Sequence, residues 1–163
     1  MDVVKRIEKA KRHYDMYGEK LKSDERIVEL LNRLERAIER TWKYMREIGV
    51  TEVCRRCALE MGSCCKRWVE DFYDVDILLI NLLLGVKLPE KRYREDLCFF
   101  CGENGCRLKA REVICVNFLC DRVLERIGEK EIELQKIAGE ELETCFILQD
   151  EIKRRLSLLQ NEQ

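Results

Sequence analysis

The stretch CRRCALEMGSCC, residues 54–65, decides how the centre of this chain folds. A CxxC pair points two sulfurs toward one point, and neighbouring backbone amides help to stabilise thiolate charge. A second pair, CFFC at residues 98–101, is followed by Cys106, Cys115 and Cys120. Two CxxC pairs that are each followed by more cysteines predict a metal site. The candidate ligands are Cys54, Cys57, Cys64, Cys65, Cys98, Cys101, Cys106, Cys115 and Cys120.

The residue types at this site indicate the class of metal. Ligation by sulfur alone favours zinc or an iron-sulfur cluster over magnesium or calcium, which prefer oxygen. The only histidine, His13, lies in a helical segment without cysteines, so we do not expect it to be a ligand. Nine cysteines exceed one tetrahedral set, and the two groups therefore supply one joint site or two adjacent sites. Because Cys64 and Cys65 point in different directions in an extended backbone, one ligates while the other serves a second site or stays free.

Disulfides or buried thiols are the alternative interpretation of ten cysteines. The initial residues, MDVVKRIEKAKRHYD, lack the apolar run of a signal peptide, and no later stretch approaches the roughly 20 apolar residues that cross a bilayer. We therefore expect a cytoplasmic protein without membrane association, in which thiols stay free or bind metal. A charged fraction of 39% and a single proline are typical of thermophiles, whose cytosolic proteins can carry disulfides, so this alternative stays open.

Length and charge limit the other function classes. A chain of 163 residues is the size of one domain, and residues 1–163 are expected to fold as a single unit. Lys and Arg together number 31 and Asp and Glu 32, so no overall field attracts nucleic acid or an anionic membrane. Phosphate-binding loops of the GxGxxG and GxxxxGK types are absent. These features argue against nucleic acid as a partner and against nucleotide-dependent catalysis.

Both ends of the chain carry the apolar periodicity of amphipathic helices. One stripe recurs at residues 3, 7, 10, 14, 17 and 21, and a second runs from 27 to 48, where Gly49 ends it. Ser23 is the expected N-cap between them, and the two helices predict an antiparallel hairpin. At the other end we expect one broad apolar helical face, with Gly128 and Gly139 as positions where glycine lowers helix stability. Its residues are Ile132, Leu134, Ile137, Leu142, Phe146, Ile152, Leu156 and Leu159.

The predicted fold is therefore mostly α, a helical bundle formed by the N- and C-terminal helices around a cysteine-rich, irregular metal-binding centre. Its parts are the hairpin 1–50, the cysteine region 51–120 and the C-terminal helices 121–163. Residues 73–85 predict a short helix that Asp74 or Asp76 caps and Gly85 ends. Cys145 is expected to be a small core residue. The aromatic residues expected in the core or around the metal are Trp42, Trp68, Tyr73, Phe99 and Phe100.

The order of these motifs resembles the YkgJ-type family of zinc- or iron-sulfur-chelating cysteine cluster proteins, whose hallmark is CxxCxxCC. The resemblance covers about residues 54–120 and includes Cys98-Phe-Phe-Cys101, Gly105-Cys106 and Arg111-Glu112-Val-Ile-Cys115. This chain differs in having six residues between the first CxxC and the CC, Glu112 in place of a proline, and added cysteines at 101 and 120. The resemblance implies metal chelation by Cys54, Cys57, Cys64, Cys65, Cys98, Cys106 and Cys115. A related motif occurs in flagellin lysine methylases, which are larger proteins.

The leading interpretation is a metal-binding protein whose helices offer a surface for a protein partner or a homodimer. One alternative is an iron-sulfur redox protein or a methylase-related enzyme, so enzymatic activity stays undecided. Another is a zinc-ribbon adaptor for nucleic acid or protein. The adaptor is suggested by Arg55, Arg56, Lys66 and Arg67, for which a solvated surface is the preferred explanation.

Overall fold

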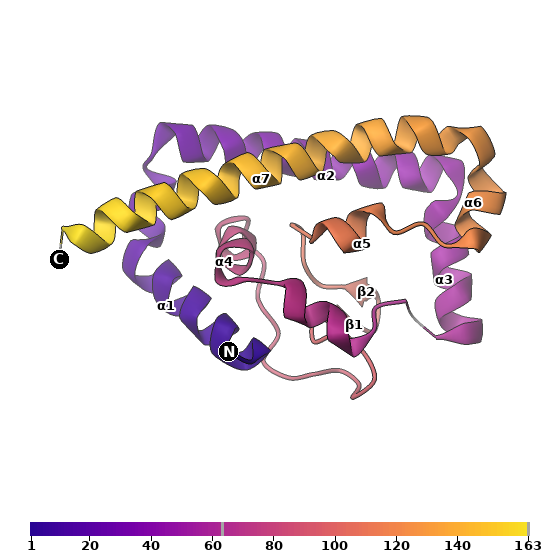
Figure 1. Ribbon diagram of the computed structural model, residues 1–163, viewed down its shortest axis with the longest axis horizontal. Coiled ribbons are helices and arrows are strands. Elements are labelled where there is room, and N and C mark those ends of the chain that lie inside the picture. The colour runs from indigo at the N-terminus through magenta and orange to yellow at the C-terminus, as the bar shows by residue number, and fades with distance from the viewer. Residues whose placement is uncertain (63, 163) are drawn as a thin grey trace.

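The computed structural model describes residues 1–62 and 64–162, most of them in helices (Figure 1). The mostly α fold class is confirmed. The α-helices are α1 Val3–Lys22, α2 Glu25–Ile48, α3 Val50–Met61, α4 Val75–Leu83, α5 Val113–Asn117, α6 Asp121–Ile127 and α7 Glu131–Asn161. Two 3₁₀ turns, η1 Arg67–Phe72 and η2 Gly128–Lys130, and the short strands β1 Cys101–Gly102 and β2 Gly105–Cys106 complete the order.

The long helices α2 and α7, from opposite ends of the chain, lie side by side along their lengths (Figure 1). Helix α7 buries a stripe at steps of three and four residues, the spacing that keeps side chains on one face. An ion pair between Arg40 and Glu140, 2.6 Å apart, joins the exposed edges of the two helices. The α2–α7 pair thus forms one layer, and the cysteine-rich centre lies below it in Figure 1.

The buried face of α7 differs from the predicted one at two positions. Ile132 is 64% exposed and Phe146 is 73% exposed. Successive residues on a helix are separated by about 100°, so Phe146 turns to solvent because its neighbour Cys145 takes the core position. The prediction that Cys145 is a small core residue is confirmed, since that side chain is buried in the main hydrophobic cluster.

The turn between α1 and α2 has a different cap from the predicted one. Ser23 donates its hydroxyl to Glu19 O and ends α1, whereas the Asp24 carboxylate accepts the backbone N–H groups of Arg26 and Ile27 and begins α2. After this turn α1 diverges from α2 and packs against α4 (Figure 1). The expected hairpin of residues 1–50 is therefore open, and α2 takes α7 as its antiparallel neighbour.

The centre contains more helix than predicted. Gly49 ends α2 with φ of +90°, a left-handed conformation that glycine adopts readily, and α3 then begins at once. Helix α3 packs against α6 through a small apolar cluster, separate from the main core. That cluster comprises Ile48, Val50, Val123, Ile127 and Leu134. In residues 1–62 and 64–162, no helix combines the length and apolar character needed to cross a membrane.

The short helix α4 is the buried element that organises the irregular segments. As predicted, Asp74 caps it by accepting the N–H of Ile77 at 3.0 Å. Its Asn81 is completely buried, and the side-chain carbonyl accepts the backbone N–H groups of Lys109 and Ala110 at 2.8 and 3.0 Å. The Asn81 amide also donates to Ala110 O at 2.9 Å. One side chain therefore satisfies three backbone groups of a segment that has no regular structure of its own.

Replacing Asn81 tests this role. The change Asn81→Leu keeps the number and branching of the side-chain heavy atoms but leaves buried backbone N–H and carbonyl groups without partners, which we expect to lower the free energy of unfolding by about 3 kcal/mol. Urea unfolding followed by circular dichroism measures the loss. Asn32→Leu, at an exposed position of α2, is the matched control and should stay within about 0.5 kcal/mol of the unsubstituted protein. Equal effects of the two changes would contradict the role given to Asn81.

Candidate metal centre

Four cysteines gather where α3 meets α6, and we call them the outer group: Cys54, Cys57, Cys64 and Cys120. Cys54 and Cys57 lie on α3, where a spacing of three residues places both on one face. Cys120 is the N-cap residue of α6. The first CxxC is therefore helical, whereas the sequence predicted a turn, but it still directs two sulfurs to the same side.

The thiols of the outer group lie close enough to influence one another electrostatically. Partial burial raises the pKa of Cys54, and the nearby thiols of Cys120, Cys64, Cys57 and Cys65 raise it further. Burial also raises the pKa of Cys64, followed by the effects of Cys57, Cys120 and Cys65, while the nearby Lys66 opposes this rise. Cys54 and Cys64 are exposed, and the other two thiols are partly exposed. The outer group is thus accessible from solvent.

A second set forms nearer the main core, and we call it the inner group: Cys65, Cys98, Cys106 and Cys115. Cys65 joins it because the backbone around Lys66 pairs with Leu97 in an antiparallel bridge, and Cys98 N donates to Cys65 O at 2.9 Å. The adjacent Cys64 belongs to the outer group. Cys65 also acts on the pKa of Cys54 and Cys64, so it lies between the two groups, and the sequence prediction that the two neighbouring cysteines serve different sites stays a prediction.

Hydrogen bonds around the inner group favour the thiolate form. Burial raises the pKa of Cys98 to about 12 and that of Cys106 to about 11, and the backbone amides of Phe100 and Leu108 oppose these shifts. Burial also raises the pKa of Cys115, whose Sγ accepts the Tyr73 hydroxyl at 3.2 Å. At neutral pH these thiols hold their protons, so a metal must displace protons when it binds.

Tyr73 is a second anchor of the segment that carries Cys115. Its ring is 1% exposed, and its hydroxyl accepts the backbone N–H of Glu112 at 3.2 Å while donating to Cys115 Sγ. Burial raises the pKa of Tyr73 far above its ordinary value, so the hydroxyl stays a donor. The Tyr73 ring packs against Phe100, with ring centroids 5.0 Å apart. The expected shielding role fits both residues, whereas Trp68 is 54% exposed and does not shield the site.

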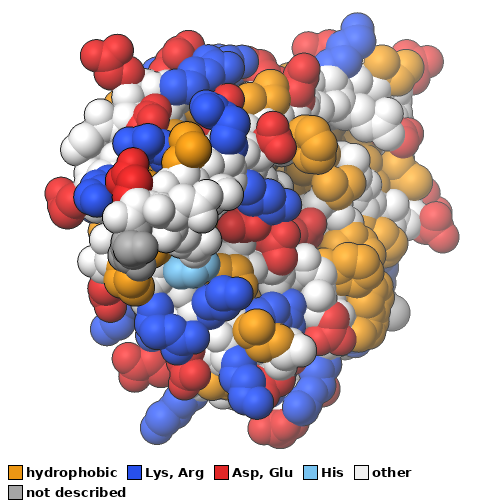
Figure 2. Space-filling model, turned by 60° about the vertical axis from the view of Figure 1, so that its left-hand side comes forward, with side chains coloured by type: hydrophobic (Ala, Val, Ile, Leu, Met, Phe, Trp, Pro, Cys, Tyr) orange, Lys and Arg blue, Asp and Glu red, His pale blue; other side chains and the backbone are white. Residues whose placement is uncertain are grey.

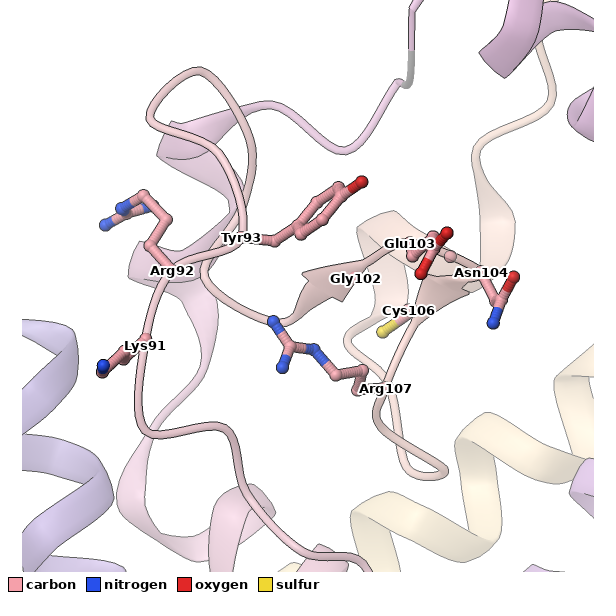
Figure 3. Close-up of a pocket in the computed structure, with 9 residues that line it drawn as sticks. Lys91, Arg92, Tyr93, Gly102, Glu103, Asn104, Cys106 and Arg107 are labelled. Atoms are coloured by element: carbon pink, nitrogen blue, oxygen red, sulfur yellow. The ribbon is translucent and has the colours of Figure 1, made fainter.

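Cys101 lies in the hairpin opposite Cys106. The β1–β2 pairing aligns the two residues, and Cys101 is buried in the main core with its Sγ 3.8 Å from Gly102 O. A groove of about 510 Å³ runs between this hairpin and residues 91–93, and Cys106 lines it. Figure 3 shows Tyr93 and Arg107 reaching into that space, whereas Arg92 points away from it. One sulfur of the inner group is therefore next to a groove open to solvent.

Neither group has the side-chain arrangement of a completed metal site. Within the described ranges, no three or more His, Cys, Asp or Glu side chains converge closely enough to hold a metal ion. The segments bring the sulfurs into two neighbourhoods without placing them in coordination geometry.

A buried ion pair holds the loop that leads to Cys98. Glu70 of η1 accepts two hydrogen bonds from Arg92, at 2.6 and 2.8 Å, and a third from the backbone N–H of Phe99 at 2.8 Å. Arg92 also donates to Leu97 O at 2.7 Å. Burial acts to raise the pKa of Glu70, but the bonds from Arg92 and Phe99 outweigh it and hold that pKa below its ordinary value. The charged network therefore fixes the backbone on both sides of Cys98.

The cations that the sequence places near the first CxxC lie mostly on the surface. Arg56 forms an ion pair with Glu52, and Arg67 forms one with Glu95, so two of the four basic residues are paired with acids. Figure 2 shows acidic and basic side chains interspersed across the face it views. Arg111, quoted above only as part of a motif, is a cation that opposes the burial-driven rise in the pKa of Cys106 and Cys115.

Sequence reasoning missed the polar residues that support the inner group. Glu70, Arg92 and Asn81 make long-range bonds that no local spacing signals. The only sequence sign of Asn81 is a polar residue inside the apolar run of residues 77–84.

Comparison with known proteins assigns no family. No protein-family model matches this chain, and no curated protein or solved structure matches it. The resemblance to YkgJ-type proteins therefore rests on the cysteine motifs alone.

The Glu70–Arg92 network predicts a specific stability loss. Glu70→Gln leaves a guanidinium that is only 12% exposed without its counter-charge, and we expect about 3 kcal/mol less stability at pH 7. Because the folded state lowers the pKa of Glu70, this contribution is present above the ordinary carboxyl pKa and is lost as pH falls through the folded value. Urea unfolding at pH 7 and under acidic conditions should show the difference shrinking in acid.

Glu95→Gln is the matched control for this measurement. Its partner Arg67 and Glu95 itself are 55% and 87% exposed, so the change should cost less than about 1 kcal/mol. A loss from Glu70→Gln as small as that of the control, or one that is independent of pH, would contradict the network.

Proposed function

We propose that the protein binds metal at two adjacent cysteine centres, an outer one formed by Cys54, Cys57, Cys64 and Cys120 and an inner one formed by Cys65, Cys98, Cys106 and Cys115. Each centre then has the four sulfurs that tetrahedral zinc or an iron-sulfur cluster takes. The proposal narrows the nine candidate ligands to eight, with Cys101 as a core residue beside the inner centre.

One observation carries the proposal. Eight cysteines spread over residues 54–120 act on one another's pKa in two overlapping sets, with Cys65 acting on members of both, and we assign Cys65 to the inner set because its backbone carbonyl accepts the N–H of Cys98. Cysteines that served only as small core residues would not need to lie so close together that the charge of one thiolate raises the pKa of another. Four thiolates become stable together when a divalent cation or a cluster offsets their charge.

The surroundings of the two centres also support metal binding. Backbone amides and the Tyr73 hydroxyl point at sulfurs of the inner group, and such bonds orient thiolate ligands and reduce their proton affinity. The outer group combines a helical CxxC pair with Cys64 and Cys120, which meet it from the loop after α3 and from the start of α6. The cysteine motifs that resemble YkgJ-type chelating proteins agree with this function.

Metal content tests the proposal directly. Protein purified without oxygen and without a metal-affinity tag should contain two equivalents of zinc, or iron and sulfide for two clusters with visible absorption. Absence of both metals, including after incubation with zinc or after cluster reconstitution, would refute metal binding.

Single cysteine variants test the division into two centres. Cys57→Ser should lose the outer metal and keep the inner one, and Cys106→Ser should do the reverse, because three sulfurs hold zinc far more weakly than four. Elemental analysis of the purified variants measures the remaining metal. Cys145→Ala, which removes a buried thiol from outside both groups, should keep both equivalents. Loss of all metal from either serine variant would indicate one joint site instead of two.

Electron transfer is a second candidate function, favoured by the adjacency of Cys64 and Cys65. If both centres are iron-sulfur clusters, ligands that are neighbours in the chain keep the clusters close, and the exposed outer group gives a partner access to one of them. A reversible change of the visible spectrum on reduction supports this function. Stoichiometric zinc with a colourless protein excludes it.

A further inference from the structure

Arg6 of α1 caps the end of the 3₁₀ turn η1. Its side chain is 11% exposed, and its Nη1 atom donates to three backbone carbonyl groups at 3.2, 3.2 and 2.5 Å. The acceptors are the carbonyl oxygens of Glu70, Asp71 and Tyr73. The last carbonyl groups of a helical turn have no partners within the turn and carry a partial negative charge, so a cation binds them favourably. One guanidinium therefore fixes the backbone at the end of η1.

Two of the three capped residues reach the inner group through their side chains. The Glu70 carboxylate accepts the backbone N–H of Phe99 at 2.8 Å, immediately after Cys98. The Tyr73 hydroxyl donates to Cys115 Sγ at 3.2 Å. The same short turn thus holds the segment that carries Cys98 through one side chain and the sulfur of Cys115 through another. The relative position of these two candidate ligands therefore depends on how firmly the backbone at residues 70–73 is held.

The turn η1 needs support from another element. It has only six residues, and the hydrogen bonds of a 3₁₀ helix are less favourable than those of an α-helix. Helix α1, in contrast, is 20 residues long and buries its apolar stripe in the main core. Hydrogen bonds from a charged donor are among the stronger ones, and the partly buried position of Arg6 strengthens them further. Arg6 thus connects a weak turn to a well-packed helix.

We propose that Arg6 is a positioning residue of the inner centre, which fixes the separation between the segments that carry Cys98 and Cys115. The proposal rests on the proposed function, because both cysteines are ligands only if the inner group binds metal. Groups that hydrogen-bond to metal ligands typically change metal affinity by about 10–100-fold when they are lost, and Arg6 acts through two such groups, Glu70 and Tyr73. It makes α1, which carries no cysteine, a support of the site.

The affinity of the inner centre for zinc tests this role. Full-length protein with Cys57→Ser, which should load only the inner centre, is titrated against a chromogenic chelator to give the Kd of zinc. Adding Arg6→Gln should raise this Kd about tenfold, because a shorter, neutral amide cannot donate to three carbonyl groups. Adding Arg6→Lys should give an intermediate Kd, since an ammonium has three donors but lies on a shorter side chain.

Cobalt(II) supplies a readout that stability alone would not change. Bound in place of zinc in the Cys57→Ser protein, it has visible absorption bands that depend on the geometry of its ligands. These bands should shift in Arg6→Gln, because the segments that carry Cys98 and Cys115 are then free to move relative to one another.

Two control variants separate positioning from general stability. Arg12→Gln removes an exposed cation from the same helix and should leave the Kd and the cobalt bands unchanged. Leu21→Val trims a fully buried side chain of α1, about 22 Å from Arg6 at about 1.5 Å per residue. It should lower the urea midpoint while leaving the Kd unchanged. A Kd that rises as much in Leu21→Val as in Arg6→Gln would mean that Arg6 acts only through stability, and that result would overturn the proposal.

The failure of this proposal is distinguishable from the failure of metal binding. A Cys57→Ser protein that binds no zinc refutes the division into two centres, and the role of Arg6 falls with it. Zinc binding with an unchanged Kd and unchanged cobalt bands in Arg6→Gln refutes only the role of Arg6. If Arg6→Gln does not fold, the comparison rests on Arg6→Lys, and an unchanged Kd in that variant overturns the proposal.

Discussion

The hydrogen bonds that anchor residues 109–115 to Asn81 of α4 and to the adjoining Tyr73 are the interaction on which the cysteine-rich centre depends. Before α5 begins, this segment has no regular secondary structure, so its backbone groups need hydrogen-bond partners from other parts of the chain. Asn81 supplies them for Lys109 and Ala110, and Tyr73 supplies them for Glu112 and the Cys115 sulfur. Because both anchors belong to or adjoin a helix buried in the main core, the positions of Arg111 and Cys115 are fixed by core packing.

The helical part of the fold was largely predictable because apolar periodicity reports one face of a helix directly. The first two helices and the short capped helix at 75–83 follow from it. The errors arose where two neighbouring residues could fill the same structural role. Asp24 competes with Ser23 for the same cap, and Cys145 takes the core position that the larger Phe146 was expected to fill. Size and hydrophobicity alone do not rank such neighbours, since the packing of the folded chain selects between them.

The cysteine grouping was only partly predictable, for a different physical reason. Spacing indicates which cysteines are near one another in the chain, as in the pair at 54 and 57, but a group that closes through long-range pairing has no local signature. Cys65 joins Cys98 through the bridge between Lys66 and Leu97, and Cys120 reaches α3 because α6 packs there. The ion pair that supports the inner group also has no sequence signature. Glu70 and Arg92 are residue types that usually lie on the surface, and only the fold buries them together.

The two groups differ in how their charge is compensated. The outer thiols are exposed or partly exposed, so water and dissolved ions screen a negative centre there and fixed cations have a small effect. Of the inner thiols Cys98 is buried and the other three are partly exposed, and around the buried part of the group screening is weaker, so each fixed donor or cation has a larger effect on thiolate stability. If both groups bind metal as proposed, the two centres would therefore hold it by different means. Solvent would stabilise the outer centre, and a preorganised set of amides and one hydroxyl would stabilise the inner one.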